Sequence, residues 1–176
     1  MKSYTEHILT VLKILAWIVF IGLCIKCGAQ LVAFIVGLIN PDFLHKMYGT
    51  DGNWVKVREE SQWVFICVMT TIIAISAFKA NIWLMLIKLF SQLNLKNPFT
   101  MEAAKKLEGI AYQLIVIWIA TSVLDNYLKG LEKYGKEFHL EISDAGEFLF
   151  AAGIIFIISQ IFKRGIEIQE ENELTV

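Results

Sequence analysis

Four long apolar segments, separated by short polar stretches, constrain the fold of this chain more than any other feature. They cover about residues 14–39, 63–87, 107–128 and 146–163. The hydrocarbon core of a bilayer is about 30 Å thick, and a helix of about 20 apolar residues crosses it. Hydrophobic residues make up 56% of the 176 residues and charged residues only 19%, too apolar for a soluble domain of this length. We predict an all-α integral membrane protein, a single domain with four transmembrane helices in two antiparallel hairpins.

The two predicted hairpins are joined by a polar hinge at residues 89–106. Asn97-Pro98 should end the second span, because a proline ring disfavours helix at the residue before it. Thr100 is suited to cap the third helix, because its hydroxyl group can accept a hydrogen bond from an amide of the first turn. Asn40-Pro41 should end the first span in the same way.

The polar loops on the side opposite the hinge, residues 42–62 and 125–147, carry a weak strand signal. Residues 54–58 and 138–142 each alternate apolar and polar side chains, which is the pattern of a half-buried strand. We predict that these two stretches pair as a small β-like cap.

The placement of lysine and arginine predicts the orientation in the membrane, because these residues favour the cytoplasmic side. The side with both termini and the hinge carries eight of them, and the other side carries six. The eight are Lys2, Lys13, Lys88, Lys96, Lys105, Lys106, Lys163 and Arg164. We predict that both termini and the hinge are cytoplasmic.

Lys26 and Lys79 are unusual because each lies inside a predicted span. A charge near the middle of a bilayer costs at least about 2.5 kcal/mol on insertion scales and usually faces a polar partner. In an antiparallel hairpin the two lysines differ in depth by about 6 Å, and Gln30 lies one turn from Lys26. One interpretation is an intramembrane polar seam of Lys26, Gln30 and Lys79. The other is that both lysines extend to the cytoplasmic interface, where their ammonium groups reach water. Further polar residues suited to such a seam are Asn81, Gln113 and Gln160.

The sequence contains no residue pattern typical of an enzyme, a cofactor site or a metal site. A phosphate-binding loop, a nucleophile elbow, an HExxH motif and paired catalytic carboxylates are all missing. Cys24 and Cys27 have the spacing of a redox or metal-binding pair, but no histidine is near them in sequence, so we interpret them as small packing residues. The net charge of −1 argues against direct binding of nucleic acid. We therefore predict a protein that is not an enzyme and binds neither cofactor nor metal.

The residues after the last span, 164–176, form an acidic tail that we predict to be cytoplasmic. One interpretation is a solvated helix end. The other is a docking peptide, in which acidic side chains and apolar anchors bind a basic cytoplasmic partner. In the docking interpretation the contacting residues come from the hinge and the tail, namely Asn97, Pro98, Phe99, Gly165, Glu167, Gln169, Glu170, Glu171 and Leu174.

The hinge from Phe90 to Phe99 and the ending from Gly165 to Val176 resemble a bacterial family of four-helix membrane proteins known as domain of unknown function 2975. The ending carries the sharpest likeness, although Ile168 and Glu173 depart conservatively from the family pattern. The resemblance implies a bacterial inner-membrane protein without an established activity or catalytic residues. It also implies a partner, because family members commonly occur beside a small helix-turn-helix regulator of the phage-repressor type.

Two functions from different classes follow. The first is a non-enzymatic sensor or scaffold in the bacterial inner membrane, which docks the helix-turn-helix regulator through residues 89–106 and 165–176. The second is a small transport or channel subunit, in which Lys26, Gln30 and Lys79 line a path for anions or small solutes. The second also predicts a homo-oligomer, because four helices enclose little space. In both, the lipid bilayer surrounds the protein and nucleic acid is not bound directly.

Overall fold

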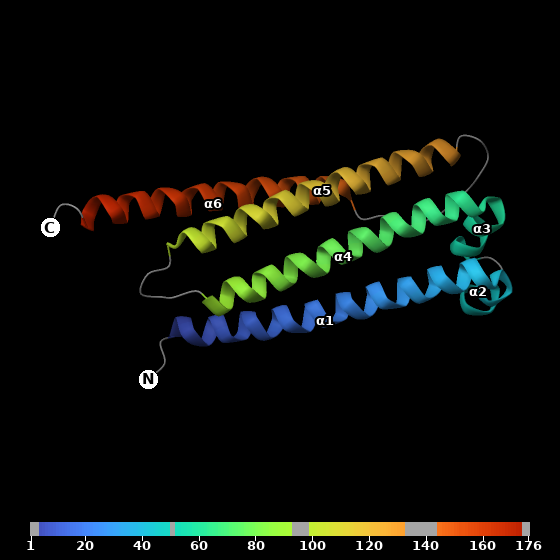
Figure 1. The fold of residues 1–176 in the computed structure, drawn as a ribbon, viewed down its shortest axis with the longest axis horizontal. Coiled ribbons are helices and arrows are strands. Elements are labelled where there is room, and N and C mark those ends of the chain that lie inside the picture. Colours follow the sequence, from blue (N-terminus) through green and yellow to red (C-terminus); the bar gives the residue numbers. More distant parts are fainter. Residues whose placement is uncertain (1–3, 50–51, 93–98, 133–143, 174–176) are drawn as a thin grey trace.

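The computed structural model describes residues 4–49, 52–92, 99–132 and 144–173, and these residues form six helices and no strand (Figure 1). The four long helices are α1 (Tyr4–Ile39), α4 (Gln62–Gln92), α5 (Met101–Glu132) and α6 (Ala145–Glu173). The two short helices, α2 (Pro41–Tyr48) and α3 (Asn53–Glu60), follow α1 in the sequence. Each long helix has the length and apolar composition needed to cross a bilayer. The prediction of an all-α, four-span membrane protein is confirmed.

The long helices form two antiparallel hairpins, α1 with α4 and α5 with α6. The start of α1, the end of α4, the start of α5 and the end of α6 lie at one end of the molecule, which we call the terminal end (Figure 1). α2 and α3 lie at the opposite end, which we call the cap end. The predicted hairpin topology is therefore confirmed.

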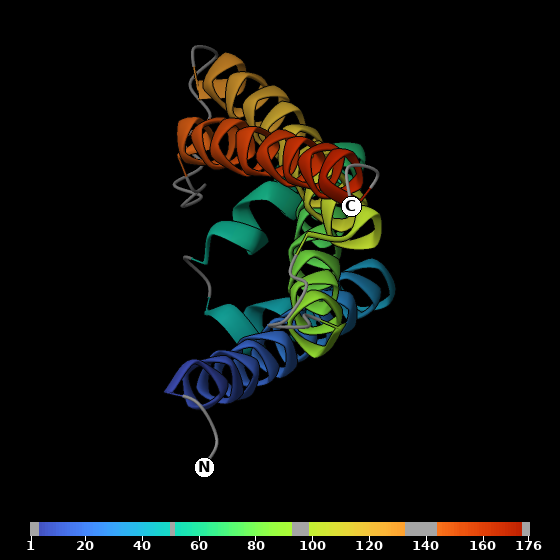
Figure 2. The ribbon, with the colours of Figure 1, turned by 90° about the vertical axis from the view of Figure 1, so that its left-hand side faces the viewer.

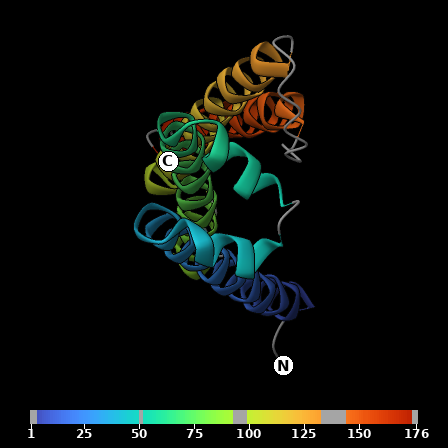
Figure 3. The same ribbon diagram turned by 90° about the vertical axis from the view of Figure 1, so that its right-hand side faces the viewer.

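The four long helices form an open arc instead of a closed bundle. Seen from the terminal end, α1 and the α5–α6 pair lie on either side of α4 and do not close on each other (Figure 2). The view from the cap end shows the same arc, with α2 and α3 on its concave side (Figure 3). The two hairpins therefore meet mainly along α4 and α5.

Local sequence signals set two helix ends as predicted. α1 ends at Ile39, and Pro41 is the first residue of α2, where its missing amide hydrogen costs no intrahelical hydrogen bond. At the start of α5, the amide of Ala103 donates a hydrogen bond to Thr100 Oγ1 at 3.2 Å. This bond is the predicted cap, because it satisfies an amide that the first helical turn leaves without a partner.

Buried residues gather on α4 and α5 and near the cap end, whereas the outer helices α1 and α6 expose much of their apolar surface. One core cluster at the cap end includes Val57 and Phe65, and a second between α4, α5 and α6 includes Ile110. On the outer helices, Ile18 is 61% exposed and Phe150 is 72% exposed. Soluble proteins rarely expose such a surface, and in a membrane lipid chains cover it.

The predicted β-like cap is wrong where the structure describes it, because residues 54–58 belong to the helix α3. Val55 and Val57 are buried and Trp54 is half-buried, but these three positions also share one broad helical face. A five-residue alternation therefore does not distinguish a strand from a short helix. The second predicted strand, at residues 138–142, lies outside the described residues.

Each long helix continues beyond the span predicted for it. α1 begins at Tyr4 instead of at about residue 14, and α6 runs without a break into the acidic tail as far as Glu173. The helices therefore carry polar turns at the terminal end that extend past their most apolar stretches.

Candidate functional site

Two of the predicted docking residues, Phe99 and Gly165, contact each other at the terminal end. A Cβ atom added to Gly165 would lie 2.8 Å from Phe99 Cδ1 and 2.9 Å from its Cγ. The Phe99 ring also packs edge-on against Phe162, with ring centroids 5.2 Å apart and ring planes at 68°. Glycine at position 165 therefore lets Phe99, two residues before α5, approach the backbone of α6.

An ion pair joins α5 to α6 in the same region. Lys163 Nζ lies 3.0 Å from both carboxylate oxygens of Glu108, and the two side chains are 32% and 20% exposed. Because both groups are partly buried, loss of either one would leave the other as an unpaired charge. We call Phe99, Glu108, Phe162, Lys163 and Gly165 together the hinge–tail contact.

Beyond the hinge–tail contact, α6 projects past the ends of the other long helices (Figure 1). Glu167, Glu170 and Glu171 are exposed on this projecting part, and Gln169 is half-buried. Arg164 Nη1 lies 2.6 Å from Glu167 Oε2, so part of the acidic charge is neutralised within the helix. Three other predicted docking residues, Asn97, Pro98 and Leu174, lie outside the described residues.

Lys79 of α4 reaches α6 and is within electrostatic range of Lys26 of α1. Lys79 Nζ is 4.7 Å from the centroid of the Phe148 ring, which is a cation–π contact. The charge of Lys26 repels the Lys79 ammonium group and the carboxylate of Glu147 attracts it, so the three charged groups interact electrostatically. Lys79 is half-buried and Lys26 is exposed.

The other polar residues of the predicted seam have different surroundings. Asn81 Nδ2 donates a hydrogen bond to Gln113 Oε1 at 3.1 Å, which joins α4 to α5, and Gln160 Nε2 donates one to Ser159 Oγ at 3.2 Å. Gln30 Oε1 is buried and accepts no hydrogen bond from the residues that the structure describes. The structure therefore places Lys26 and Lys79 within electrostatic range of each other and adds Phe148 and Glu147, which the sequence alone did not suggest.

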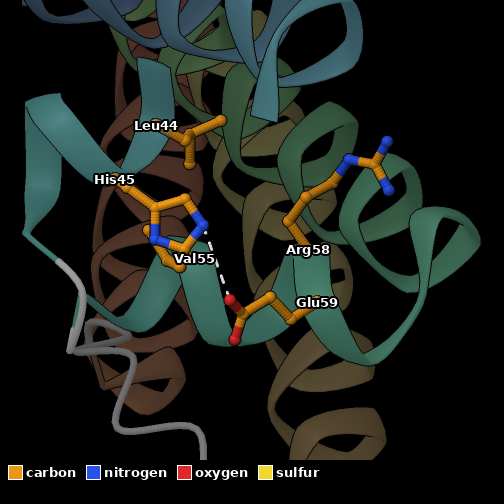
Figure 4. Close-up of a pocket in the computed structure, with 5 residues that line it drawn as sticks. All are labelled: Leu44, His45, Val55, Arg58 and Glu59. Carbon is orange, nitrogen blue, oxygen red and sulfur yellow. Dashed lines mark ion pairs between the residues drawn. The ribbon is translucent and has the colours of Figure 1, made fainter. Parts of the chain in front are cut away.

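Sequence reasoning also missed a pocket between α2 and α3 at the cap end. Its cavity of about 260 Å³ is lined by Leu44, His45, Val55, Arg58 and Glu59 (Figure 4). His45 Nε2 and Glu59 Oε1 face each other at 3.5 Å, whereas the Arg58 side chain points away from them (Figure 4). The strand predicted at residues 54–58 concealed this pocket, because the pocket forms between two short helices.

No metal site is formed by the part of the chain that the structure describes, since it contains no group of three His, Cys, Asp or Glu side chains suited to hold an ion. Cys24 is exposed and Cys27 is half-buried. The Cys27 Sγ atom lies 4.0 Å from the backbone oxygen of Ile73, so this cysteine packs where α1 meets α4.

Comparison with known proteins gives one match. A family model described as protein of unknown function (DUF2975) matches residues 10–176 of this chain, which include the hinge and the tail. No curated protein and no solved structure matches it.

Proposed function

Because the chain belongs to the family of proteins of unknown function DUF2975, the family that its hinge and tail resemble, we propose its role from its own geometry. In this proposal it is a non-enzymatic sensor or scaffold of a bacterial inner membrane that holds a small helix-turn-helix regulator at its terminal end. Both chain termini are then cytoplasmic, on the side where a DNA-binding regulator acts. The observation that carries the proposal is the acidic end of α6, which projects beyond the other long helices (Figure 1).

The hinge–tail contact supports this role because it gives the projecting helix a defined position. Phe99 packs on Gly165 and Phe162, and Lys163 pairs with Glu108. A docking segment that is already ordered loses less conformational entropy on binding than a disordered one. Phe99 and Gly165 would therefore position the docking surface, and the residues after Gly165 would form it.

The chemistry of the projecting turns suits a basic partner with a small apolar patch. Glu167, Glu170 and Glu171 are exposed, and Ile168 between them is 46% exposed. A DNA-binding regulator carries a basic surface, because it neutralises backbone phosphates when it binds. The acidic end of α6 and DNA would then compete for that surface, which keeps the regulator at the membrane until it is released.

Co-purification tests this proposal. The full chain is co-expressed with a small helix-turn-helix regulator of the phage-repressor type, and recovery of the membrane protein on the tagged regulator is measured in detergent. We expect the variant Glu167→Gln, Glu170→Gln, Glu171→Gln to reduce recovery by about tenfold, because it removes the charge complementarity that steers and holds a basic partner. Removal of residues 166–176 should do the same while it leaves Gly165 in contact with Phe99.

A matched control neutralises three acidic residues away from the terminal end. The variant Asp42→Asn, Glu59→Gln, Asp125→Asn changes the net charge by the same amount and should leave recovery unchanged. Full recovery of the regulator after removal of residues 166–176 would exclude docking through the tail.

A second candidate function, a small transport or channel subunit, is favoured by the electrostatic interaction of Lys26 and Lys79. Two neighbouring ammonium groups attract anions, and the open arc would then need further copies of the chain to enclose a path. Anion efflux from proteoliposomes that is lost in Lys79→Gln would support this function. Efflux equal to that of empty vesicles would exclude a transport or channel function.

A further inference from the structure

The short helices α2 and α3 follow directly on the part of the first hairpin that reaches the cap-end surface of a bilayer. From Lys13 to its last residue, Ile39, α1 rises about 39 Å, and α4 rises about the same distance between Gln62 and Lys88. A hydrocarbon core is about 30 Å thick, and a bilayer with its headgroups is about 40–45 Å thick. With Lys13 and Lys88 among the headgroups of one leaflet, α2 and α3 therefore lie among those of the other.

The pocket between α2 and α3 thus opens at the depth of lipid headgroups. Its cavity of about 260 Å³ has an apolar floor, since Leu44 and Val55 are 2% and 1% exposed. His45 and Glu59 face each other above this floor, and their side chains are 32% and 62% exposed (Figure 4). Pockets for drug-sized ligands have about 300–1,000 Å³, so this cavity fits a smaller group.

Among the residues that line the cavity, Glu59 supplies the charge that a ligand meets. The Arg58 side chain points away from the His45–Glu59 pair, and its Nε donates a hydrogen bond to the backbone oxygen of Gly37 at 3.1 Å (Figure 4). The 3.5 Å between His45 Nε2 and Glu59 Oε1 exceeds the usual 2.7–3.2 Å of an N–H···O hydrogen bond. The Glu59 carboxylate can therefore accept hydrogen bonds from a cationic ligand.

We propose that this pocket binds a primary ammonium group. Such a group has three N–H donors, of which one bonds to the Glu59 carboxylate and one to the unprotonated nitrogen of a neutral His45 imidazole. The methylene groups that carry the ammonium lie on Leu44 and Val55. A quaternary ammonium has no N–H donor and would leave both acceptors without a hydrogen bond, so the site distinguishes ethanolamine from choline.

Two sources can supply this chemistry, namely the headgroup of phosphatidylethanolamine and a soluble amine such as ethanolamine. Both present the same ammonium group, and only the first also carries acyl chains into the bilayer. The proposal does not rest on docking of a regulator, because the pocket lies at the cap end and the acidic end of α6 lies at the terminal end.

Native mass spectrometry of the full chain in detergent at pH 8 tests the lipid source. Phosphatidylethanolamine and phosphatidylcholine with the same acyl chains are added separately. We expect the first to bind about tenfold more tightly, and we expect Glu59→Gln to remove this difference, because it removes the charged acceptor. More than half of the Glu59 side chain is exposed, so the variant keeps the helix packing intact.

The thermal unfolding midpoint without added lipid tests the soluble source. If a soluble amine is the ligand, ethanolamine raises the midpoint more than choline does at the same concentration, and Glu59→Gln abolishes the difference. In both experiments Asp42→Asn is the matched control. Asp42 is an exposed carboxylate on α2 that does not line the cavity, so its removal changes the net charge equally and should alter affinity by less than about twofold.

The outcomes separate the two sources from failure of the proposal. A preference for the ethanolamine compound in the lipid experiment assigns the site to a headgroup, and one seen only with soluble amines assigns it to a free amine. Equal binding of ethanolamine and choline compounds in both experiments would overturn the proposal. A preference that persists in Glu59→Gln, or that Asp42→Asn abolishes equally, would overturn it as well. Loss of regulator co-purification leaves it standing, because ligand binding is measured without the regulator.

Discussion

At position 165, a hydrogen atom in place of a side chain decides how closely Phe99, two residues before α5, approaches α6. The Phe99 ring occupies the space where a Cβ atom would lie. Gly153, on the same helix, has no neighbour within 4 Å of an added Cβ atom. The two glycines therefore share a helix and differ in their contacts, which makes them a matched pair for mutation.

We predict that Gly165→Ala lowers the thermal unfolding midpoint in detergent relative to Gly153→Ala. Both variants gain about 1 kcal/mol of helix propensity, but the methyl group at position 165 also forces Phe99 to move, at about 1–3 kcal/mol. In a Phe99→Ala background the difference should disappear, because the clash has been removed. Equal midpoints in the unmodified background would mean that the Phe99 ring moves aside without a loss of stability.

Individual residues were predictable where their partners are local. Thr100 caps α5 through an amide three residues away, and Pro41 ends α1 through its own ring. Lys79 contacts Phe148, which lies on a helix far along the chain. The periodicity of apolar residues gives no information on which turn of α6 meets which turn of α4. For the same reason, the sequence did not suggest that Phe99 and Gly165 contact each other.

Among the elements, the short helix α3 is bonded to the end of α1 through Arg58. Arg58 Nε donates a hydrogen bond to the backbone oxygen of Gly37 at 3.1 Å. Gly37 lies in the last turn of α1, whose carbonyl groups have no intrahelical partner and carry the negative end of the helix dipole. A cation placed there stabilises the end of α1 and holds α3 against it.

We predict that Arg58→Ala lowers the free energy of unfolding by about 1–2 kcal/mol, because it removes a charged hydrogen bond from a helix C-terminus. Lys56→Ala, on the same short helix, is the control, since Lys56 is exposed. Chemical denaturation followed by circular dichroism gives the comparison. An effect of equal size in both variants would assign the loss to α3 as a helix and not to the contact with Gly37.

The joint between the two hairpins includes a polar contact between Asn81 of α4 and Gln113 of α5. Asn81 donates to Gln113 at 3.1 Å, and Gln113 Nε2 donates to Met85 Sδ at 3.2 Å. We predict that Gln113→Leu lowers the free energy of unfolding by about 0.6–1.7 kcal/mol, the range for hydrogen bonds between membrane helices. Gln160→Leu should cost less, because Gln160 bonds to its neighbour in the sequence. The free energy of unfolding of both variants is measured in the same detergent. A larger loss for Gln160→Leu would contradict a stabilising role of the Asn81–Gln113 contact.

The short element α3 also marks the limit of pattern reading at this scale. Long apolar segments identify long helices, since about 20 residues give many chances to test the period. Residues 54–58 give only one turn, and the burial of Val55 and Val57 fits either period. Length, more than composition, separates the elements that were predicted correctly from the one that was wrong.

For the molecule as a whole, the placement of lysine and arginine makes the orientation testable. We predict that green fluorescent protein fused after Val176 is fluorescent and that alkaline phosphatase fused there is inactive, because the placement of lysine and arginine favours a cytoplasmic terminal end. Alkaline phosphatase fused after Lys136 should be active, because α5 ends at Glu132, at the end of the molecule opposite the terminal end. Activity of the phosphatase after Val176 would reverse the assignment.

The whole arrangement could be predicted only in part. Four spans with short connections require antiparallel hairpins, and the structure has them. The open arc could not be predicted, because apolar faces that meet lipid and apolar faces that meet another helix have the same composition. The exposure of Ile18 and the burial of Ile110 follow from the positions of α1 and α5 in the arc and not from their sequence.

Because the two hairpins meet mainly along α4 and α5, a tilt of α5 relative to α4 would move one hairpin against the other. α5 has 32 residues and is about 48 Å long. A tilt of about 10° around its cap end would move its other end by about 8 Å, more than one helical turn. Since the hinge–tail contact couples α6 to α5, a small rotation of α5 at the cap end would move the acidic end of α6 by a comparable distance at the terminal end.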